Sequence, residues 1–337
     1  MKNQEKIFVI GHKNPDTDSI CSAIAYCDIK NRTTQEGRYI PKRAGQINEE
    51  TEYVLNRFGV QPPGYLSNIG TQVKDMDIRL SPEANKSMSL KNAWDLMQEN
   101  SIVSLPIREK DGTLEGLITI GDIAKTYMDT TDSYLLSRAR TQYQRIAETI
   151  GGKVIEGNGH GYFIQGKIMV AAANPDKMKE YVKENDMVIM GNREEDHLQA
   201  IEQNVSCIIV GMGIEVTDRV LKLAHEKDII VISSPYDTFT ISRLINQSIP
   251  VKYIMKTDNL VTFNTEDFTD DIQEVMIKHR HRAFPVINKK GKCIGTISRR
   301  NFLDMHRKKV VLVDHNEKDQ AVDNIDKAEI MEIIDHH

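Results

Sequence analysis

The stretch IFVIGHKNPDTDS (residues 7–19) joins an apolar run directly to a histidine, a proline and two aspartates. The apolar run is typical of a buried β-strand because it is short and rich in β-branched and aromatic residues. A solvent-exposed turn does not require the imidazole of His12, and a hydrophobic core does not tolerate the unpaired carboxylates of Asp16 and Asp18. We therefore expect the end of this strand to contribute ligands to a binding crevice.

The composition is that of a globular chain without a strong charge bias. Of the 337 residues, 39% are hydrophobic and 28% are charged, and the formal net charge is −5. This length allows two or three domains, and the charge favours neither nucleic acid nor an anionic membrane as a partner. The four cysteines form no C-x-x-C pair, and no apolar run reaches the roughly 18 residues of a membrane helix. We expect a cytoplasmic protein.

Two segments of the chain repeat one another. SIVSLPIREKDGTLEGLITIGDIA (residues 101–124) lines up with HRHRAFPVINKKGKCIGTISRRNFL (residues 279–303). An amphipathic helical pattern precedes each copy, so both predict the order helix, strand, turn, strand, helix. The matching pairs, each separated by 179 residues, are Pro106 and Pro285, Gly116 and Gly295, Thr119 and Ser298, and Asp122 and Asn301. This pattern resembles the CBS domain, which works as an intramolecular pair, over residues 73–129 and 249–308.

A separate α/β segment is predicted between the two copies, over residues 131–248. Short apolar strands alternate there with helical stretches, which indicates a parallel sheet. The closing stretch SSPYDTFTISRLI (residues 233–245) resembles the DRTGG domain. Removing this regulatory block leaves residues 1–70 and 309–337, which together predict one parallel α/β domain interrupted by the insert.

Three predicted strands of that domain end in acids and histidines: GHKNPDTD, VDHN and DHH. The carboxyl ends of parallel strands meet at one edge of a sheet, so these ends predict one polynuclear metal site. Nitrogen and oxygen ligands without sulfur suit Mn²⁺, Co²⁺ or Mg²⁺, with two or more ions in the site. Two such metal ions close together activate a water molecule and hold a phosphoryl group in position for its attack. Ser19 is expected to cap the helix that follows. The candidate residues are His12, Asp16, Asp18, Asp314, His315, Asp335, His336 and His337.

The same motifs resemble the catalytic domain of family II inorganic pyrophosphatases, which are DHH phosphoesterases. A subset of that family carries a CBS–DRTGG–CBS insert at this place. The resemblance implies one metal on His12, Asp16 and Asp314, and a second on Asp18, Asp314 and His336, with Asp314 bridging. It also implies that His337 contacts the substrate and assists the leaving phosphate. His315 and Asp335 are expected to support the metal ligands through hydrogen bonds.

The family continues beyond the DHH motif with a further aspartate ligand and a basic substrate-binding domain. We therefore expect this chain by itself to be an incomplete catalytic unit for pyrophosphate.

The repeats predict regulation by adenine nucleotides. In CBS pairs of this kind, a Ser or Thr meets a phosphate and an acid meets a ribose. The matching residues are Thr119 with Asp122 and Ser298 with Asn301, and Arg280 and Arg282 are expected to pair with phosphates. We expect AMP, ADP, ATP or diadenosine polyphosphates as ligands, and a homodimer built through the CBS pairs.

Two other functions stay open at this point. One is a DHH phosphodiesterase that acts on oligonucleotides or cyclic dinucleotides. Those enzymes typically read P-D-G-D, whereas this chain reads Pro15-Asp16-Thr17-Asp18, which favours pyrophosphatase. The other is an adenine-nucleotide sensor without catalytic activity.

Overall fold

The computed structural model describes the whole chain except residues 1–4, 35–36, 129–131, 173–174, 304 and 336–337. The chain divides into two compact units. The first contains residues 1–79, 263–289 and 296–337, and the second contains residues 80–262 and 290–295. Within the described residues, no helix is long and apolar enough to cross a membrane.

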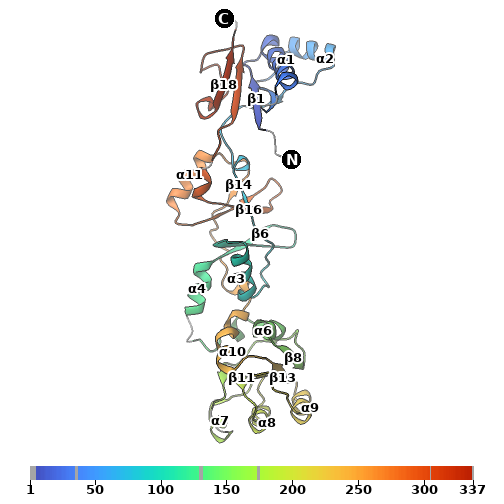
Figure 1. Ribbon diagram of the computed structural model, residues 1–337, viewed down its shortest axis with the longest axis vertical. Helices are drawn as coiled ribbons and strands as arrows, with labels where there is room; N and C mark the ends of the chain where they lie inside the picture. The colour runs from blue at the N-terminus through green and yellow to red at the C-terminus, as the bar shows by residue number, and fades with distance from the viewer. Residues whose placement is uncertain (1–4, 35–36, 129–131, 173–174, 304, 336–337) are drawn as a thin grey trace. The chain divides into compact units, whose positions relative to one another are not determined.

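The first unit is built on a five-stranded parallel sheet with the spatial order β18-β17-β1-β2-β3. Helices α1 (Thr17–Thr33) and α2 (Glu49–Phe58) follow β1 and β2, because parallel neighbours need a crossover between them. Figure 1 shows β1 and β18, from opposite ends of the chain, in this sheet. The predicted interrupted α/β fold is confirmed. The strands are β1 (Lys6–Ile10), β2 (Arg38–Arg43), β3 (Gly64–Tyr65), β17 (Lys309–Val313) and β18 (Glu329–Ile334).

The two faces of this sheet bury separate apolar clusters. Side chains that alternate along β1 and β17 point to opposite faces, as the period of a strand requires. On the face that α1 covers, Val9 and Val311 pack with Ala23 and Cys27. The opposite face holds Ile10, Ala44, Ile69, Val310, Leu312, Ala321, Val322, Ile325 and Ala328. Both faces are therefore covered, and the carboxyl edge is left to carry the polar side chains.

Helix α1 begins earlier than expected. Its N-cap is Asp16, whose carboxylate accepts a hydrogen bond from the Ser19 backbone N–H at 2.9 Å. The prediction that Ser19 caps the helix is wrong, because Ser19 lies inside the first turn and is buried. Its hydroxyl oxygen instead accepts from the His12 backbone N–H at 3.2 Å. The helix therefore starts inside the PDTDS stretch, directly beneath the end of β1.

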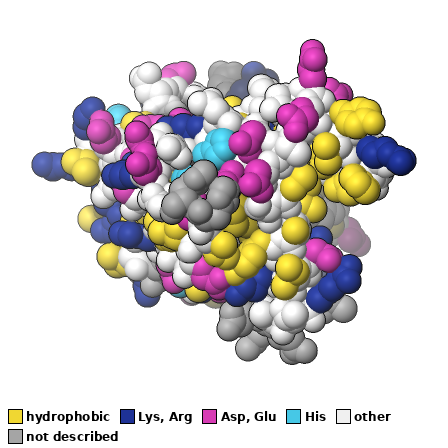
Figure 2. Space-filling view, turned by 90° about the horizontal axis from the view of Figure 1, so that it is seen from above, with side chains coloured by type: hydrophobic (Ala, Val, Ile, Leu, Met, Phe, Trp, Pro, Cys, Tyr) yellow, Lys and Arg dark blue, Asp and Glu magenta, His cyan; other side chains and the backbone are white. Residues whose placement is uncertain are grey.

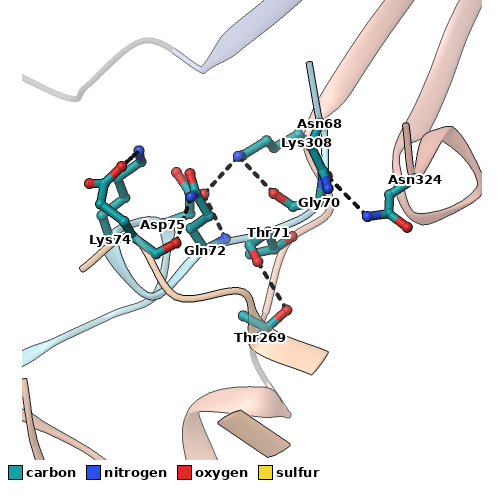
Figure 3. A network of polar contacts seen from close by, with 10 residues as sticks. Asn68, Gly70, Thr71, Gln72, Lys74, Asp75, Thr269, Lys308 and Asn324 are labelled. Atoms are coloured by element: carbon teal, nitrogen blue, oxygen red, sulfur yellow. Dashed lines mark hydrogen bonds and ion pairs between the residues drawn. The ribbon is translucent and has the colours of Figure 1, made fainter. Parts of the chain in front are cut away.

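A polar network orders the segments that lead into and out of the insert (Figure 3). The Lys308 ammonium donates to the Gly70 carbonyl at 3.0 Å and pairs with the Asp75 carboxylate at 2.9 Å. The Thr269 backbone N–H donates to the Thr71 carbonyl at 3.0 Å. Lys308 immediately precedes β17 and is largely buried, so this network anchors the start of that strand.

The two repeat copies have the predicted element order, except that the last helix of the second copy is a 3-10 turn. Each strand pair is joined by a tight turn. The first copy contains α3 (Leu90–Glu99), β5 (Ser104–Arg108), β6 (Leu114–Thr119) and α4 (Ile120–Met128). The second contains β14 (Phe263–Asn264), α11 (Thr269–Lys278), β15 (Phe284–Ile287), β16 (Cys293–Ile297) and η4 (Arg299–Phe302).

The segment between the copies folds around a sheet with the order β10-β11-β12-β13-β8, in which only the edge strand β8 is antiparallel. Figure 1 shows α7, α8 and α9 on one side of this sheet and α6 and α10 on the other. The strands are β8 (Lys153–Glu156), β10 (Ile168–Val170), β11 (Met187–Met190), β12 (Cys207–Val210) and β13 (Ile230–Ser233). The helices are α6 (Tyr143–Thr149), α7 (Pro175–Tyr181), α8 (Glu194–Glu202), α9 (Asp218–Glu226) and α10 (Thr238–Leu244).

The remaining short elements connect these bodies. In the first unit they are η1 (Val73–Asp75) and η5 (Ile325–Lys327), and β4 (Arg79–Leu80) follows η1. In the second unit they are α5 (Leu135–Arg138), β7 (Thr141–Gln142), β9 (Tyr162–Phe163), η2 (Ile245–Ser248) and η3 (Val251–Tyr253).

Candidate metal site

Three side chains meet at the carboxyl edge of the first sheet. His12 follows β1, Asp314 follows β17, and Asp16 caps α1. The His12 Nε2 atom lies 3.4 Å from the Asp314 Oδ2 atom and 3.7 Å from the Asp16 Oδ1 atom. One ligand atom of each residue lies within 4.8 Å of the others. Among the described residues, these three form the one group of His, Cys, Asp or Glu side chains close enough to share a metal ion.

The backbone of Asp314 turns sharply at the strand end. Its φ is +61°, in the left-handed region that aspartate adopts more readily than most residues. The Asp314 backbone N–H donates to the Ile334 carbonyl at 2.8 Å, which ties the turn to β18. The residue is only 7% exposed, so its carboxylate is largely shielded from solvent. A buried carboxylate of this kind needs a cation or hydrogen-bond donors to offset its desolvation.

The three residues line an open cavity of about 620 Å³. Asp18, in the first turn of α1, lines it as well and accepts a hydrogen bond from the Ser22 hydroxyl at 3.0 Å. In Figure 2 a histidine side chain lies among several acidic side chains on this face. The complete lining is His12, Lys13, Asn14, Asp16, Asp18, Asp314, Asp319 and Gln320.

Asn14, Asp319 and Gln320 are lining residues that the sequence did not single out. Asp319 and Gln320 lie in a polar loop after β17 that carries no distinctive motif. The signal that places this loop at the site is a backbone bond, in which the Lys13 N–H donates to the Gln320 carbonyl at 2.8 Å. The Lys13 ammonium pairs with Asp323 at 2.9 Å, so its charge is partly neutralised at the rim.

Two glycines allow the loop after β1 to pack closely. A Cβ atom on Gly11 would lie 1.8 Å from the Ser19 hydroxyl oxygen, and one on Gly45 would lie 2.0 Å from the Lys13 carbonyl oxygen. Neither contact leaves room for a side chain. The position of His12 and Lys13 therefore depends on a bare backbone at both sites.

His315 and Asp335 do not line the cavity. His315 is buried, its Nδ1 atom lies 3.0 Å from the Val313 carbonyl oxygen, and its Nε2 atom has no hydrogen-bond partner within the described residues. Burial lowers the pKa of His315, so the ring is neutral at neutral pH. Asp335 accepts a hydrogen bond from the Asn316 amide at 2.7 Å. His336 and His337 lie outside the described residues.

The donor set fits a metal such as Mn²⁺ or Co²⁺. One imidazole and two carboxylates offer nitrogen and oxygen ligands and no thiolate. Burial and the neighbouring Asp18 raise the pKa of the Cys21 thiol, which keeps the nearest cysteine protonated. The Ser19 N–H in the first turn of α1 donates to the Asp16 carboxylate at 2.9 Å and so orients that side chain. These residues can therefore hold at least one divalent cation.

The residues predicted to contact nucleotides form the same local structure in both copies. The Asp122 carboxylate accepts from the Thr119 backbone N–H at 2.9 Å and from its hydroxyl at 2.6 Å. The Asn301 side-chain oxygen accepts from the Ser298 backbone N–H at 2.8 Å and from its hydroxyl at 3.0 Å. Each pair thus closes the start of its helical turn as a capping box. Arg280 and Arg282 are exposed.

Comparison with known proteins identifies the domains of the insert. The CBS domain family matches residues 77–129 and 251–308, and the DRTGG domain family matches residues 145–248. The cobalt-dependent inorganic pyrophosphatase of Clostridium perfringens is 39% identical over 335 residues, which is 99% of this chain. A probable manganese-dependent inorganic pyrophosphatase of Thermotoga maritima is 32% identical over the whole chain. The chain spans 61% of the length of each of these relatives.

A solved structure matches the insert itself. It is the crystal structure of the CBS and DRTGG domains of the regulatory region of Clostridium perfringens pyrophosphatase, complexed with the activator diadenosine tetraphosphate. It shares 34% identity and a TM-score of 0.64 with this chain, and the match covers 68% of this chain and 100% of that one. The chain therefore contains a CBS–DRTGG–CBS region of the same family as that regulatory region.

These similarities confirm the resemblance to CBS- and DRTGG-containing pyrophosphatases drawn from the GHKNPDTD, VDHN and DHH motifs and from the repeated insert. The roles of individual site residues in this chain stay predictions. The structure brings together four of the predicted residues, His12, Asp16 and Asp18 from the GHKNPDTD motif and Asp314 from the VDHN motif. It leaves His315 and Asp335 outside the cavity lining.

The left-handed turn at Asp314 gives a prediction for stability. Asp314→Ala and Asp314→Gly both remove the carboxylate, but only glycine adopts a positive φ without strain. We expect the free energy of unfolding of the glycine variant to exceed that of the alanine variant by about 1–2 kcal/mol. Urea denaturation followed by circular dichroism measures the difference. Equal stability of the two variants would contradict a strained turn at this position.

Proposed function

We propose that this chain contributes the metal centre of an enzyme that hydrolyses inorganic pyrophosphate to two phosphates. The observation that carries the proposal is the convergence of His12, Asp16 and Asp314 within 4.8 Å, from two neighbouring strand ends and a helix start. The names of two long-matching relatives, a cobalt-dependent and a probable manganese-dependent pyrophosphatase, support Co²⁺ or Mn²⁺ as the metal.

His12, Asp16 and Asp314 are the residues that would hold a first ion, and Asp18, Asp314 and His336 a second, with Asp314 shared. A bound divalent ion supplies Lewis acidity and lowers the pKa of a coordinated water. The side chains hold their geometry before any ligand arrives, because Asp16 is fixed by the Ser19 N–H and Asp314 by its strand-end turn. The start of α1 and Lys13 would attract an anionic phosphate, and His337 would donate a proton to the leaving phosphate.

Metal titration tests this centre. Isothermal calorimetry with Mn²⁺ should show binding that Asp314→Asn weakens more than any other single change, because only that carboxylate is shared by both ions. Asparagine tolerates the positive φ, so the fold is preserved and the loss reports on the ligand. Lys13→Ala is the matched control, since it lines the same cavity without offering a metal ligand. Equal losses from the two variants would contradict the sharing of Asp314.

We further propose that adenine nucleotides, including diadenosine polyphosphates, regulate the enzyme through the CBS repeats. Support comes from the two Ser/Thr–Asp/Asn pairs and from the exposed Arg280 and Arg282, which are available for phosphates. The matched regulatory region of the Clostridium perfringens enzyme is complexed with diadenosine tetraphosphate. A ligand of this kind shifts activity only through its different affinities for two arrangements, a coupling of about 1–3 kcal/mol.

Calorimetry with AMP checks this proposal. Asp122→Ala and Asn301→Ala should each weaken AMP binding about tenfold, a loss expected when a hydrogen-bonding partner is removed. Glu99→Ala, on the exposed end of α3, is the control and should leave binding unchanged. If both variants bind AMP as tightly as the unaltered chain, the Thr119–Asp122 and Ser298–Asn301 pairs only cap their helical turns. The same conclusion would follow if the unaltered chain did not bind AMP at millimolar concentration.

We also propose a homodimer formed through the CBS repeats. Helix α4 has no fully buried residue: Ile120 and Ile123 are partly buried against the neighbouring core, and Tyr127 and Met128 are exposed. Tyr127 is 41% exposed and Met128 is 78% exposed, so the helix presents an apolar face that a second copy can cover in a closed two-fold contact.

Light scattering at micromolar concentration should give twice the chain mass of 38.4 kDa. Tyr127→Asp should shift the mass toward the monomer, because a charge on this face would be buried without a partner. Tyr162→Asp, at a similarly exposed tyrosine away from α4, should not. A monomer mass for the unaltered chain would refute the proposed dimer.

A further inference from the structure

The edge strand β18 has little hydrophobic preference for one register. Its sequence EIMEII carries apolar side chains on both faces, and Ile330, Met331, Ile333 and Ile334 are each between 40% and 50% exposed. A strand whose two faces are alike is prone to slip along its neighbour. Some other interaction must therefore select the observed pairing with β17.

The pairing of β17 with β18 contains an irregularity. Val310 is opposite Ile330, but Val311 is opposite Glu332, so Met331 is an extra residue in β18. Beyond this point the register runs regularly, and Val313 is opposite Ile334. Bulges of this kind re-aim the residues that follow them, often beside a functional site. Here the residue that follows the strand is Asp335.

Glu332, directly after the extra residue, is held by two side chains of α1. The Lys30 ammonium lies 2.6 Å from the Glu332 Oε1 atom, and the Tyr26 hydroxyl donates to the Oε2 atom. Lys30 also lies over the rings of Tyr26 and Tyr39, 5.4 and 5.7 Å from their centroids. These hydrogen bonds lower the pKa of Glu332 and raise that of Lys30, so both stay charged at neutral pH.

This cluster connects α1, whose start carries metal-site residues, to β18, which holds the Asp314 turn. Helix α1 begins at Asp16 and Asp18, and it supplies Tyr26 and Lys30 two to four turns later. Strand β18, past the extra residue, supplies the Ile334 carbonyl that accepts the Asp314 N–H at 2.8 Å. A slip of β18 by one residue would remove that acceptor and release the Asp314 turn.

We propose that Lys30, Tyr26 and Glu332 are positioning residues that lock the register of β18 and thereby hold the Asp314 turn against the start of α1. The effect of this cluster on metal affinity rests on the proposed metal centre. The cluster contacts no metal ligand itself and acts only through the strand pairing.

Amide hydrogen exchange on the metal-free protein tests the register directly. Lys30→Met keeps the apolar stem on the tyrosine rings and removes the charge, and Glu332→Gln removes the opposite charge. We expect the Asp314 amide to exchange roughly tenfold faster in each variant, while the amides of β1 keep their rates. Arg32→Met is the matched control, because it breaks the exposed pair with Asp28 on the same helix. The charge-reversed pair Lys30→Glu with Glu332→Lys should restore the slow exchange.

Mn²⁺ calorimetry on the same variants separates the two proposals. The positioning role predicts that affinity falls roughly tenfold in Lys30→Met and is regained in the charge-reversed pair. Unchanged exchange at Asp314, or equal acceleration throughout the sheet, would overturn the positioning role whatever the metal does. Absence of metal binding in the unaltered protein would refute the metal centre. The exchange rates would still show whether the cluster fixes the register of β18.

Discussion

The pairing of β1 with β17 is the constraint on which the metal site depends. Ile10 is opposite Leu312 in this register, and His12 and Asp314 each follow two residues later. The two residues are 302 positions apart in the chain, and the whole regulatory insert lies between them. Because neighbouring parallel strands end at the same edge, their imidazole and carboxylate meet without any long side chain reaching across. The cap of α1 then adds Asp16 to the pair.

The insert enters and leaves this domain close to that constraint. Lys308, one residue before β17, is bonded to the Gly70 carbonyl and to Asp75, which belong to the incoming segment. The two connections are therefore fastened to each other where β17 begins. A change in the CBS repeats that strained this network would act on the strand that ends at Asp314. The expected nucleotide-contact residues Asp122 and Asn301 already cap their own helical turns, so a ligand would have to share or exchange those bonds.

Much of the fold and part of the site could be predicted because the signals were local. Strand ends rich in His and Asp, and a repeat with constant spacing, are visible in the sequence alone. The prediction that Ser19 caps α1 was mistaken, since Ser and Asp are both good caps and only the packing of Ser19 under His12 decides in favour of Asp16. Asp319 and Gln320 were missed because loop residues reach the site through a backbone bond. The extra residue in β18 leaves no trace in a strand that is apolar on both faces.

We expect His12, Asp16 and Asp314 to share one divalent cation. Anomalous diffraction at the manganese absorption edge, from crystals of the protein grown with Mn²⁺, tests it most directly. We expect an anomalous peak bonded to the His12 Nε2 atom and to a carboxylate oxygen from each of Asp16 and Asp314. A peak elsewhere that leaves these three side chains without an ion, or a bound ion that excludes Asp314, would contradict it.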